Sequence, residues 1–404
     1  MNKQHIDIPC PEHAVDIIER LQDHDFEAYI VGGYVRDHFV GLHPKDIDIV
    51  TNAEPEEIHS IFGKQCLLIG RRFRLAHIRY GREVVEVSTF RSSHEGNEDP
   101  NQAKHQDGMI VRDNVYGTLE EDMARRDFNI NALYYDPVSQ TLLDPYDGVA
   151  ALQQQTLHCI GDPEQRFIED PVRITRAFRF ASKLGITLPA EILDAIPHQV
   201  ARYANVPAGR RFDEYTKLML TGHAIENFAL LEEFGLLDNF FPSMTSYLID
   251  SDYYEFFCAA LENTDNRIQQ EKGVHPIFLV AVFLWPAYQE QFDHYLEQGR
   301  PPYIARDEAM EKLLSVQCQM MSIPRRFTHN LRQIWAMQFT LEQRRPKHIL
   351  EIMSRPRFRA AYDFLLLRAA IGEVPQELAE WWTKIQEVGG KERHTMIHQV
   401  SRKA

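Results

Sequence analysis

The sequence has few cysteines and no long apolar run. Its five cysteines are scattered singly, without C-x-x-C pairs or zinc-finger spacing, which indicates reduced thiols and argues against structural zinc. No apolar stretch approaches the roughly 20 residues that a membrane-spanning helix needs, and the first residues contain no signal-peptide core. A G-x-x-x-x-G-K-[ST] phosphate loop is also missing, which excludes the P-loop NTPases. We therefore expect a cytoplasmic protein.

Positive charge is scarce overall, because 44 Lys and Arg stand against 59 Asp and Glu, a formal net charge of −15. Such a chain is not expected to coat nucleic acid indiscriminately, since non-specific binding depends on neutralising phosphates. A local basic groove is still compatible with this charge if arginine-containing runs converge on one face. Those runs are Arg71–Arg74, Arg125–Arg126, Arg166–Arg179, Arg210–Arg211, Arg325–Arg326, Arg344–Lys347 and Arg355–Arg359.

With 404 residues the chain is too long for one typical core, which predicts two or more domains. The first part mixes helix and strand patterns, and begins with a helix over residues 12–25 whose buried face carries Val15, Ile18 and Leu21. From Pro163 onward helical periodicity dominates. The predicted fold class is therefore α+β, a small mixed sheet with helices followed by an all-helical part. Strands are predicted over residues 27–31, 47–51, 65–70, 74–80, 83–90 and 132–135, and a further helix over 54–62.

Residues 30–51 have the pattern of a strand, a double-glycine turn, a short helix and a second strand. Asp46 and Asp48 lie two apart on that second strand, so their carboxylates share one face. Adjacent carboxylates repel each other unless a cation lies between them, and hard oxygen ligands suit Mg²⁺. A lone D-x-D is ordinarily a solvated strand end, but here it follows a glycine turn at a short spacing. The stretch therefore predicts a magnesium site.

The glycine turn predicts a phosphate site beside it. Gly32 and Gly33 lack side chains, so a triphosphate can approach the backbone closely, and the following helix offers free N–H groups. Arg36 is then expected to hold a phosphate. Glu86, on the polar face of the strand at 83–90, is the candidate third carboxylate of the metal site. From the residues alone, an ordinary outward-facing glutamate is an equally weighted alternative.

The order and spacing of several motifs resemble one known family, the class II nucleotidyltransferases. This family comprises the bacterial CCA-adding enzymes and the bacterial poly(A) polymerases. The motifs that carry the resemblance are GGYVRDHFVGLHPKDIDIVT, RRDFNINAL and EDPVR. The resemblance implies a catalytic head over residues 1–150, a helical neck for base recognition over 151–245, and a helical, RNA-binding body and tail over 246–404. It also implies two Mg²⁺ ions and an ATP substrate at the carboxylates Asp46, Asp48 and Glu86.

The RRDFNINAL motif follows a polar, aperiodic stretch at 92–113, which predicts a loop, and a capping-box pattern at 118–121 that opens a helix. The resemblance implies that Arg126 contacts the nucleotide and that Asp127 selects or orients the ribose near the catalytic centre. The alternative is a set of Arg–Asp salt bridges at a helix end, which we expect for Arg125 more than for its neighbours.

The segment from Arg166 to Gly185 carries the remaining candidate residues. In the family an E-D-x-x-R element reads the Watson–Crick edge of the incoming base, so Asp170 and Arg173 are expected to contact adenine. Arg176 and Arg179 continue the three-residue spacing of Arg173 and are further candidates on the same ridge. A solvated charged helix face is the alternative interpretation of this ridge.

Three other segments bear on the domains and the RNA. DPYDGVAAL resembles the motif that joins the head to the next domain, although the family commonly has a second glycine where this chain has Asp147, a difference that we expect to affect hinge geometry rather than chemistry. Residues 323–335 and 355–369 place arginines beside aromatic residues, a pattern that is typical of grips on single-stranded nucleic acid.

The two branches of the family differ in one segment, residues 68–78. Here LIGRRFRLAHI matches the signature of the poly(A) polymerases, so we expect a template-independent RNA adenylyltransferase with single-stranded RNA 3′ ends as partner. The rivals are a CCA-adding enzyme, which uses CTP as well as ATP, and a non-catalytic RNA-binding protein that kept the fold. Better-known members end in a basic tail, whereas this chain ends at Ala404, which predicts weaker non-specific RNA binding and lower processivity. RNA-decay accessory proteins are candidate further partners, and whether they supply the missing basic surface is left open by the sequence.

Overall fold

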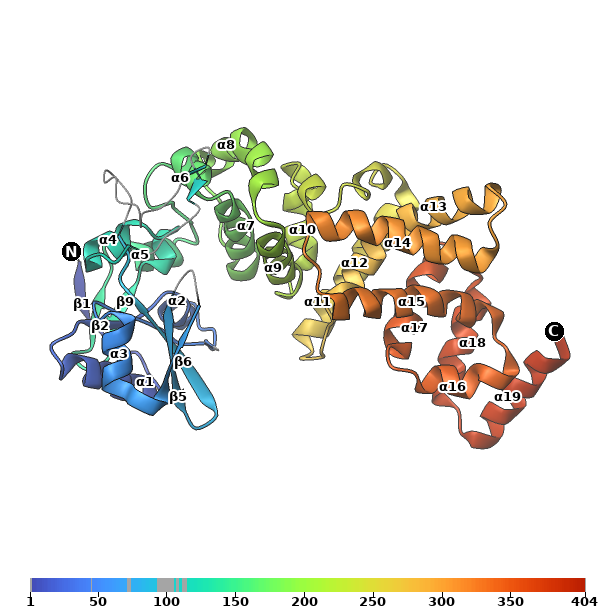
Figure 1. Cartoon of the computed structure of the whole chain (residues 1–404), viewed down its shortest axis with the longest axis horizontal. Helices are drawn as coiled ribbons and strands as arrows, with labels where there is room; N and C mark the ends of the chain where they lie inside the picture. Colours follow the sequence, from blue (N-terminus) through green and yellow to red (C-terminus); the bar gives the residue numbers. More distant parts are fainter. Residues whose placement is uncertain are drawn as a thin grey trace. The chain divides into compact units, whose positions relative to one another are not determined.

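The computed structural model describes residues 2–44, 46–70, 74–92, 105–106, 109–110 and 115–403 (Figure 1). The chain divides into two compact units, Met1–Arg202 and Tyr203–Ala404. This division falls inside the predicted neck at 151–245, and the boundaries of head, neck and body stay a prediction. Part of the predicted branch signature, residues 71–73, lies outside the described residues. So does most of the predicted loop at 92–113, where two short paired strands, β7 (His105–Gln106) and β8 (Met109–Ile110), are described.

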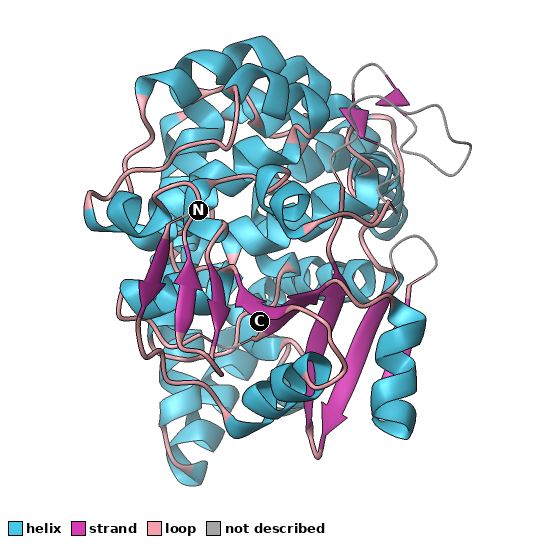
Figure 2. Cartoon of the chain, turned by 90° about the vertical axis from the view of Figure 1, so that its left-hand side faces the viewer, coloured by secondary structure: helices cyan, strands magenta, loops and turns pink. Residues whose placement is uncertain are grey.

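The first unit contains a mixed sheet of eight strands in the described part of the chain (Figure 2). Neighbouring strands are antiparallel except β3 and β6, which run parallel. The predicted α+β fold with a mixed sheet is confirmed. The edge strand β1 and the strand β10 were not predicted, because three residues are too few to show an alternating pattern. The strand order is β1 (Lys3–His5), β10 (Thr141–Leu143), β9 (Tyr134–Asp136), β2 (Ala28–Val31), β3 (Asp48–Thr51), β6 (Glu83–Thr89), β5 (Leu75–Tyr80) and β4 (Cys66–Ile69).

Helices cover both faces of this sheet. On one face lie α1 (Glu12–Gln22) and α3 (Pro55–Phe62), and on the other α4 (Leu119–Ala124) packs over a core that contains Val31 and Val50. Asp48 lies two residues before Val50 and therefore belongs to the same face as this core. The candidate metal site thus lies at the start of β3, next to the packed face of the sheet.

The buried face of α1 differs from the one predicted. Ile18 and Leu21 are fully buried as expected, but Val15 is only partly buried, and Ala14 and Ile17 take its place. Residues 14, 17, 18 and 21 lie on one face of a helix, as the helical period requires. The predicted helix was therefore correct, but its buried face is rotated by about one residue from the predicted one.

The helix predicted after Thr118 is shorter than expected. Thr118 and Glu121 form the capping box, but α4 ends at Ala124, and the chain reaches β9 through a 3₁₀ turn, η2 (Asn129–Asn131). The reason is local: the side chains of Asp127 and Asn129 accept hydrogen bonds from the backbone N–H groups of the residues that follow them. Such bonds compete with helical hydrogen bonds, so the RRDFNIN segment is held in an irregular conformation.

Asp147 precedes α5 (Gly148–Gln153) with φ 54° and ψ 36°, in the left-handed region. Glycine adopts this conformation without a steric cost and aspartate is among the few other residues that tolerate it, which explains the glycine that the family commonly has here. Gly148 is required for space, because a Cβ at this position would lie 2.5 Å from the carbonyl oxygen of Asn129. Asp144 fixes the turn by accepting from the N–H groups of Gly148 and Val149.

After β10 the described chain is helical, as predicted. The first unit ends with α6 (Pro163–Glu169), α7 (Val172–Leu184) and α8 (Ala190–Gln199). None of the helices in the described part is long and apolar enough to cross a membrane. The second unit contains α9 (Ala208–Met219), α10 (Ala224–Glu233), α11 (Ser251–Gln269), α12 (Ile277–Phe283), α13 (Trp285–Glu297), α14 (Pro302–Met320), α15 (Arg325–Gln343), α16 (Ile349–Ser354), α17 (Phe358–Ala370), α18 (Gln376–Glu387) and α19 (Gly390–Lys403).

Candidate active site

The parallel pair of strands brings the candidate carboxylates together. In the register of β3 and β6, Asp48 lies directly opposite Glu86, and Asp46 lies two residues before Asp48. Asp46 and Asp48 are exposed, and no described residue forms a hydrogen bond or ion pair with either side chain. Glu86 has one imidazole neighbour on the next strand, since its Oε2 lies 3.6 Å from Nε2 of His77. The sequence thus placed Asp48 and Glu86 side by side, whereas Asp46 precedes β3 instead of lying on it as predicted. Their role as metal ligands stays a prediction.

The electrostatics of Asp48 show that these carboxylates repel each other. Partial loss of hydration raises the pKa of Asp48, and the neighbouring Glu86 and Asp46 raise it further, while Arg126 opposes them. The charged form of Asp48 is therefore disfavoured by two like charges, and a cation at this position removes the repulsion.

The donor set suits a divalent cation held partly by substrate. In the described part of the chain no three acidic, His or Cys side chains close around a single point as a complete metal cage does. Mg²⁺ does not need such a cage, because it is commonly held by one or two carboxylates, waters and substrate phosphates. The exposed, oxygen-only set of Asp46, Asp48 and Glu86 fits that pattern.

The glycine turn lies at the end of β2. Gly32 has φ 66°, which requires glycine, and Gly33 begins the seven-residue helix α2 (Gly33–Phe39). A Cβ on Gly33 would lie 3.7 Å from Nη2 of Arg36, so the missing side chain leaves that nitrogen accessible from the turn. Both glycines thus have a structural reason to be where the sequence analysis placed a phosphate site.

Arg36 is buried and already engaged. Its Nε and Nη2 donate to Asp37 Oδ1 at 2.8 and 2.5 Å, and its Nη1 donates to Asn131 Oδ1 at 2.8 Å. Lys183 of α7 reaches the other oxygen of Asp37 at 3.5 Å. A guanidinium has five N–H groups, so two remain for a ligand. Arg36 is consequently held in one orientation before any phosphate arrives.

The two arginines of the RRD motif share one buried carboxylate. Asp122 accepts from Nη2 of Arg125 at 2.9 Å and from Nη2 of Arg126 at 3.1 Å. Arg126 also donates to the hydroxyl of Tyr134 at 2.5 Å and to the carbonyl of Asn131 at 3.2 Å. A salt bridge was expected for Arg125 more than for its neighbours, but Arg125 and Arg126 both form one, because the α4 turn presents Asp122 to both guanidinium groups.

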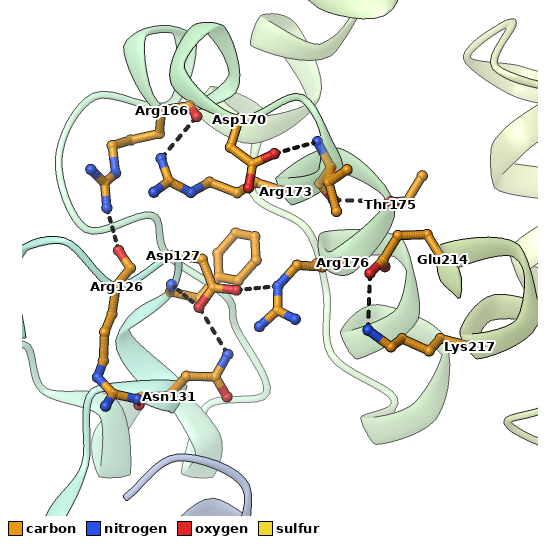
Figure 3. A network of polar contacts seen from close by, with 12 residues as sticks. Arg126, Asp127, Asn131, Arg166, Asp170, Arg173, Thr175, Arg176, Glu214 and Lys217 are labelled. Atoms are coloured by element: carbon orange, nitrogen blue, oxygen red, sulfur yellow. Dashed lines mark hydrogen bonds and ion pairs between the residues drawn. The ribbon is translucent and has the colours of Figure 1, made fainter. Parts of the chain in front are cut away.

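Asp127 lies at the centre of the polar network in Figure 3. It is 9 % exposed and accepts from Arg176 Nε at 2.5 Å and from Asn131 Nδ2 at 3.1 Å. Burial alone would raise the pKa of Asp127, but Arg176 and the Asn131 amide hold it below its usual range. Asn131 bonds both Arg36 and Asp127, so one amide connects the glycine turn to α7.

The predicted arginine ridge of α7 is divided between two environments. Arg173 is buried and donates to the carbonyl of Arg166 at 2.9 Å (Figure 3). It also donates to Glu169 at 2.8 Å, and Arg166 bonds the same carboxylate. Asp170 accepts from the N–H of Val172 at 3.2 Å and lies between α6 and α7. The charged side chains of the E-D-x-x-R element thus bond to one another and to nearby backbone groups.

Arg176 and Arg179 lie on the other side, around the ring of Phe180. The guanidinium carbons of Arg36, Arg176 and Arg179 lie 5.0, 5.5 and 5.2 Å from the centre of this ring. Phe180 is 4 % exposed and rests edge-on against Phe128. The face of an aromatic ring attracts cations, so Phe180 gives three guanidinium groups a common support.

Sequence reasoning missed the residues that hold the candidates in place. Asp37, Asn131 and Phe180 each contact at least one predicted site residue, yet none was singled out. Asp37 and Asn131 lie inside the motifs GGYVRDHFVGLHPKDIDIVT and RRDFNINAL. The available signals were therefore an aspartate directly after Arg36 and an asparagine four residues after Asp127. Phe180 gave no signal, because a phenylalanine on a helix is ordinarily core.

Comparison with protein families covers most of this chain. Residues 28–158 match the Poly A polymerase head domain, residues 185–248 a family described as the probable RNA and SrmB-binding site of polymerase A, and residues 298–404 the polymerase A arginine-rich C-terminus. Poly(A) polymerase I of Haemophilus influenzae is 41% identical over 396 residues, which are 96% of this chain and 88% of that protein.

Relatives from the other branch match less of the chain. The CC-adding tRNA nucleotidyltransferase of Halalkalibacterium halodurans is 36% identical, but the match covers 55% of this chain and 52% of that protein. Among solved structures, an apo form of a tRNA-processing enzyme superposes with a TM-score of 0.65 at 20% identity, covering 98% of this chain and 99% of that one, which shows a shared fold. From the identity along almost its whole length, this chain belongs to the bacterial poly(A) polymerase family of nucleotidyltransferases.

Proposed function

We propose that this chain adds AMP from ATP to RNA 3′ ends without a template and releases pyrophosphate. The observation that carries this function is the 41% identity to a poly(A) polymerase across 96% of the chain. The reaction is a polynucleotide adenylyl transfer. It is one that positioning and charge stabilisation can accelerate without a covalent enzyme intermediate.

In this proposal Asp46, Asp48 and Glu86 are the ligands of two Mg²⁺ ions. The unpaired carboxylates and the raised pKa of Asp48 support this assignment. When bound, the metal lowers the pKa of the RNA 3′-hydroxyl and neutralises charge on the leaving pyrophosphate. The protein's own contribution is to keep Asp48 and Glu86 on paired strands, with Asp46 two residues before Asp48, so that little ordering is needed when ATP and RNA arrive.

The proposed nucleotide-binding residues contact different parts of ATP. Gly32 and Gly33 let the triphosphate approach the backbone, and the two unused N–H groups of Arg36 hold a phosphate oxygen. Arg126 and Asp127 act at the ribose. A carboxylate has about four acceptor positions, and Asp127 uses three of them in the structure, one for Arg176. One position is left to accept a hydrogen bond from the ribose. The residues proposed to favour adenine are Asp170, Arg173, Arg176 and Arg179.

Asn131 is a positioning residue in this scheme. Its amide oxygen accepts from Arg36 and its amide nitrogen donates to Asp127, so the phosphate side and the ribose side of the site share one side chain. A shift of the bound ribose therefore reaches Arg36 through two hydrogen bonds. We propose that correct seating of the sugar and the grip on the triphosphate depend on each other in this way.

Single-stranded RNA 3′ ends are the proposed partner, acted on in RNA processing and turnover, with accessory RNA-decay proteins as further partners. We also propose that the reaction takes place in the cytoplasm, where RNA and ATP meet. A CCA-adding activity is the second candidate. It is favoured by the match to the H. halodurans enzyme, but that match ends after about half of this chain.

One assay separates these functions. A short unstructured RNA and a tRNA without its terminal CCA are each incubated with Mg²⁺ and one nucleotide at a time, and the products are resolved on a gel. We expect a long ladder on the unstructured RNA with ATP alone. Extension confined to the tRNA, requiring CTP and then ATP and stopping after three additions, would establish the CCA-adding reaction instead, and no extension would leave an RNA-binding protein.

A further inference from the structure

The second unit contains a cavity of about 730 Å³ that the proposed mechanism does not use. It lies between α11, the loop that follows it, the start of α12 and α17. These helices pack directly against one another within the unit, α11 on both α12 and α17. The volume is in the range of sites that hold small molecules or single nucleotides.

The cavity is rich in positive charge although the chain is acidic overall. Arg267, Lys272, Arg357 and Arg359 line it, and Asp363 is the carboxylate among its lining residues. Asp363 pairs with Arg359 at 2.9 Å and lies 4.0 Å from Arg267. In the described part of the chain, no carboxylate lies within ion-pair distance of Lys272 or Arg357, and both are exposed. Lys272 Nζ donates to the amide oxygen of Gln270 at 2.7 Å, a contact that leaves its charge without a counter-ion. Two cations without an opposing carboxylate therefore face an anionic ligand.

The rest of the lining suits a nucleobase. Asn263, Asn266 and Gln270 supply side-chain amides that donate and accept hydrogen bonds, as base edges require. Phe278 and Leu366 supply apolar surface, and an aromatic ring can stack on a base of any identity. A combination of free cations, amides and an aromatic ring fits a nucleotide better than it fits an inorganic anion, which needs no apolar contact.

Two segments with arginines beside aromatic residues converge at this cavity. Arg357 and Arg359 come from residues 355–369. From residues 323–335, Phe327 lies edge-on to His275 with ring centres 4.8 Å apart, and Asn330 Nδ2 lies 3.1 Å from His275 Nε2. The fold thus brings together the two segments whose sequences each have a pattern typical of binding single-stranded nucleic acid.

His275 does not contribute charge at neutral pH. Burial lowers the pKa of His275, and the nearby cations Arg357 and Arg326 lower it further. Of these two arginines, Arg357 lines the cavity, where it would meet a phosphate. The positive charge of the cavity comes from lysine and arginine and persists across the physiological pH range.

We propose that this cavity binds a nucleotide of the RNA substrate upstream of its 3′ end. Lys272 and Arg357 hold the phosphate, and the base lies against Phe278 within reach of the amides. This inference rests on the proposed function, because it takes RNA as the substrate. It gives the second unit a defined RNA contact that is separate from the adenylyl-transfer site.

The test compares two double variants for binding of a fluorescent, unstructured oligo(A) RNA of about 20 nucleotides, longer than the ~4–16 that one RNA-binding fold covers. Arg357→Asn with Lys272→Gln removes the two free cations, and asparagine tolerates the left-handed backbone of Arg357 (φ 75°). Arg300→Gln with Lys384→Gln removes the same charge elsewhere in the unit, from exposed pairs with Glu308 and Glu392.

We expect the cavity variant to bind the RNA about tenfold more weakly. Its slope of log affinity against log salt concentration should fall by roughly 0.7, the contribution of one phosphate contact on a single strand. The control should change little. Asp363→Asn, which removes the opposing carboxylate, should bind more tightly. Equal affinity and slope for the two double variants, or weaker binding by Asp363→Asn, would overturn the proposal.

Two further readouts separate this proposal from the proposed function. Adenylation at saturating RNA should keep its kcat in the cavity variant while KM for RNA rises; absence of adenylation in the unmodified protein would defeat the proposed function but not the binding result. Titration with ATP alone, without RNA, should be identical for both proteins. Loss of ATP binding in the cavity variant would mean that the cavity holds a free nucleotide, which overturns the assignment to RNA.

Discussion

The first unit contains two groups of like charges, the carboxylates near the start of β3 and the arginines of α7, and they differ in whether the chain itself supplies opposite charges. At the start of β3, Asp48 lies opposite Glu86 and the charge of Asp46 adds to the repulsion, which Arg126 opposes. Around α7, by contrast, the arginines are matched: Arg176 pairs with Asp127, and Arg173 with Glu169. The carboxylates lie at the solvent edge, whereas these guanidinium groups are partly or fully buried.

The difference shows which charges are completed by the protein and which need a ligand. A buried charge without a partner costs several kcal/mol, so the arginines of α7 require carboxylates in the folded chain itself. Carboxylates at an exposed edge keep water as a neighbour and tolerate repulsion, so they can wait for a cation. The proposed metal ligands thus lack partners in the chain itself, while the residues proposed to contact the base already have them.

Removing a carboxylate from the open group should have the largest effect on activity. We predict that Asp46→Ala lowers the adenylation rate by roughly 10³-fold, about 4 kcal/mol in activation free energy, because one metal ligand is lost. The thermal unfolding temperature should stay close to that of the unmodified protein, since Asp46 has no bond to break among the described residues. Turnover retained at a normal rate would refute the metal assignment.

Removing a carboxylate from the matched group should instead act on stability. Asp127→Ala leaves Arg176 without its partner, and we expect a loss of about 3 kcal/mol in the free energy of unfolding, measured by urea titration. The pKa of Asp127 is lowered in the folded state, so its stabilisation is present above the ordinary value of 3.8 and is lost as pH falls further. The difference between the two proteins should therefore shrink in acid; a constant difference would contradict the ion pair.

The amide that joins the two groups of contacts gives a smaller effect. Asn131→Ala should cost about 1.5 kcal/mol of stability and raise KM for ATP more than it lowers kcat, because Arg36 and Asp127 lose their common partner. Asn52→Ala is the control, since its amide bonds the backbone of Glu27 away from the arginines. An equal change of KM in the control would assign Asn131 a purely structural role.

The smallest effect should have the opposite sign. In chelator, Asp48→Asn relieves the repulsion from Glu86 and Asp46 and should raise the unfolding temperature slightly, by ~1–2 °C. Because the folded-state pKa of Asp48 is raised, its penalty is full above that pKa and vanishes as pH falls below the ordinary value of 3.8. The gain should disappear at low pH, and calorimetry at pH 7 and in acid checks this. A lower unfolding temperature at pH 7 would show that Asp48 stabilises the sheet.

Much of the first unit was predictable because its signals are local. Alternation and glycine spacing gave β2, β3 and β6 nearly to the residue, and with them the positions of Asp48 and Glu86. The same local logic failed for RRDFNIN, where Asp127 and Asn129 bond the backbone and end the helix early. It also missed β1, whose place depends on pairing with β10, more than a hundred residues away.

The sequence by itself determined which side chains share a face of a strand or helix, because the periods of 2 and 3.6 are properties of the backbone. That was enough to place the carboxylates and to show the family resemblance. Only the tertiary structure decided the partners of each charge: that Asn131 connects Arg36 with Asp127, that Phe180 supports three arginines, and that Arg357 and Lys272 meet at one cavity. These pairings join residues far apart in the chain, and their energies depend on burial, which no single stretch of sequence specifies.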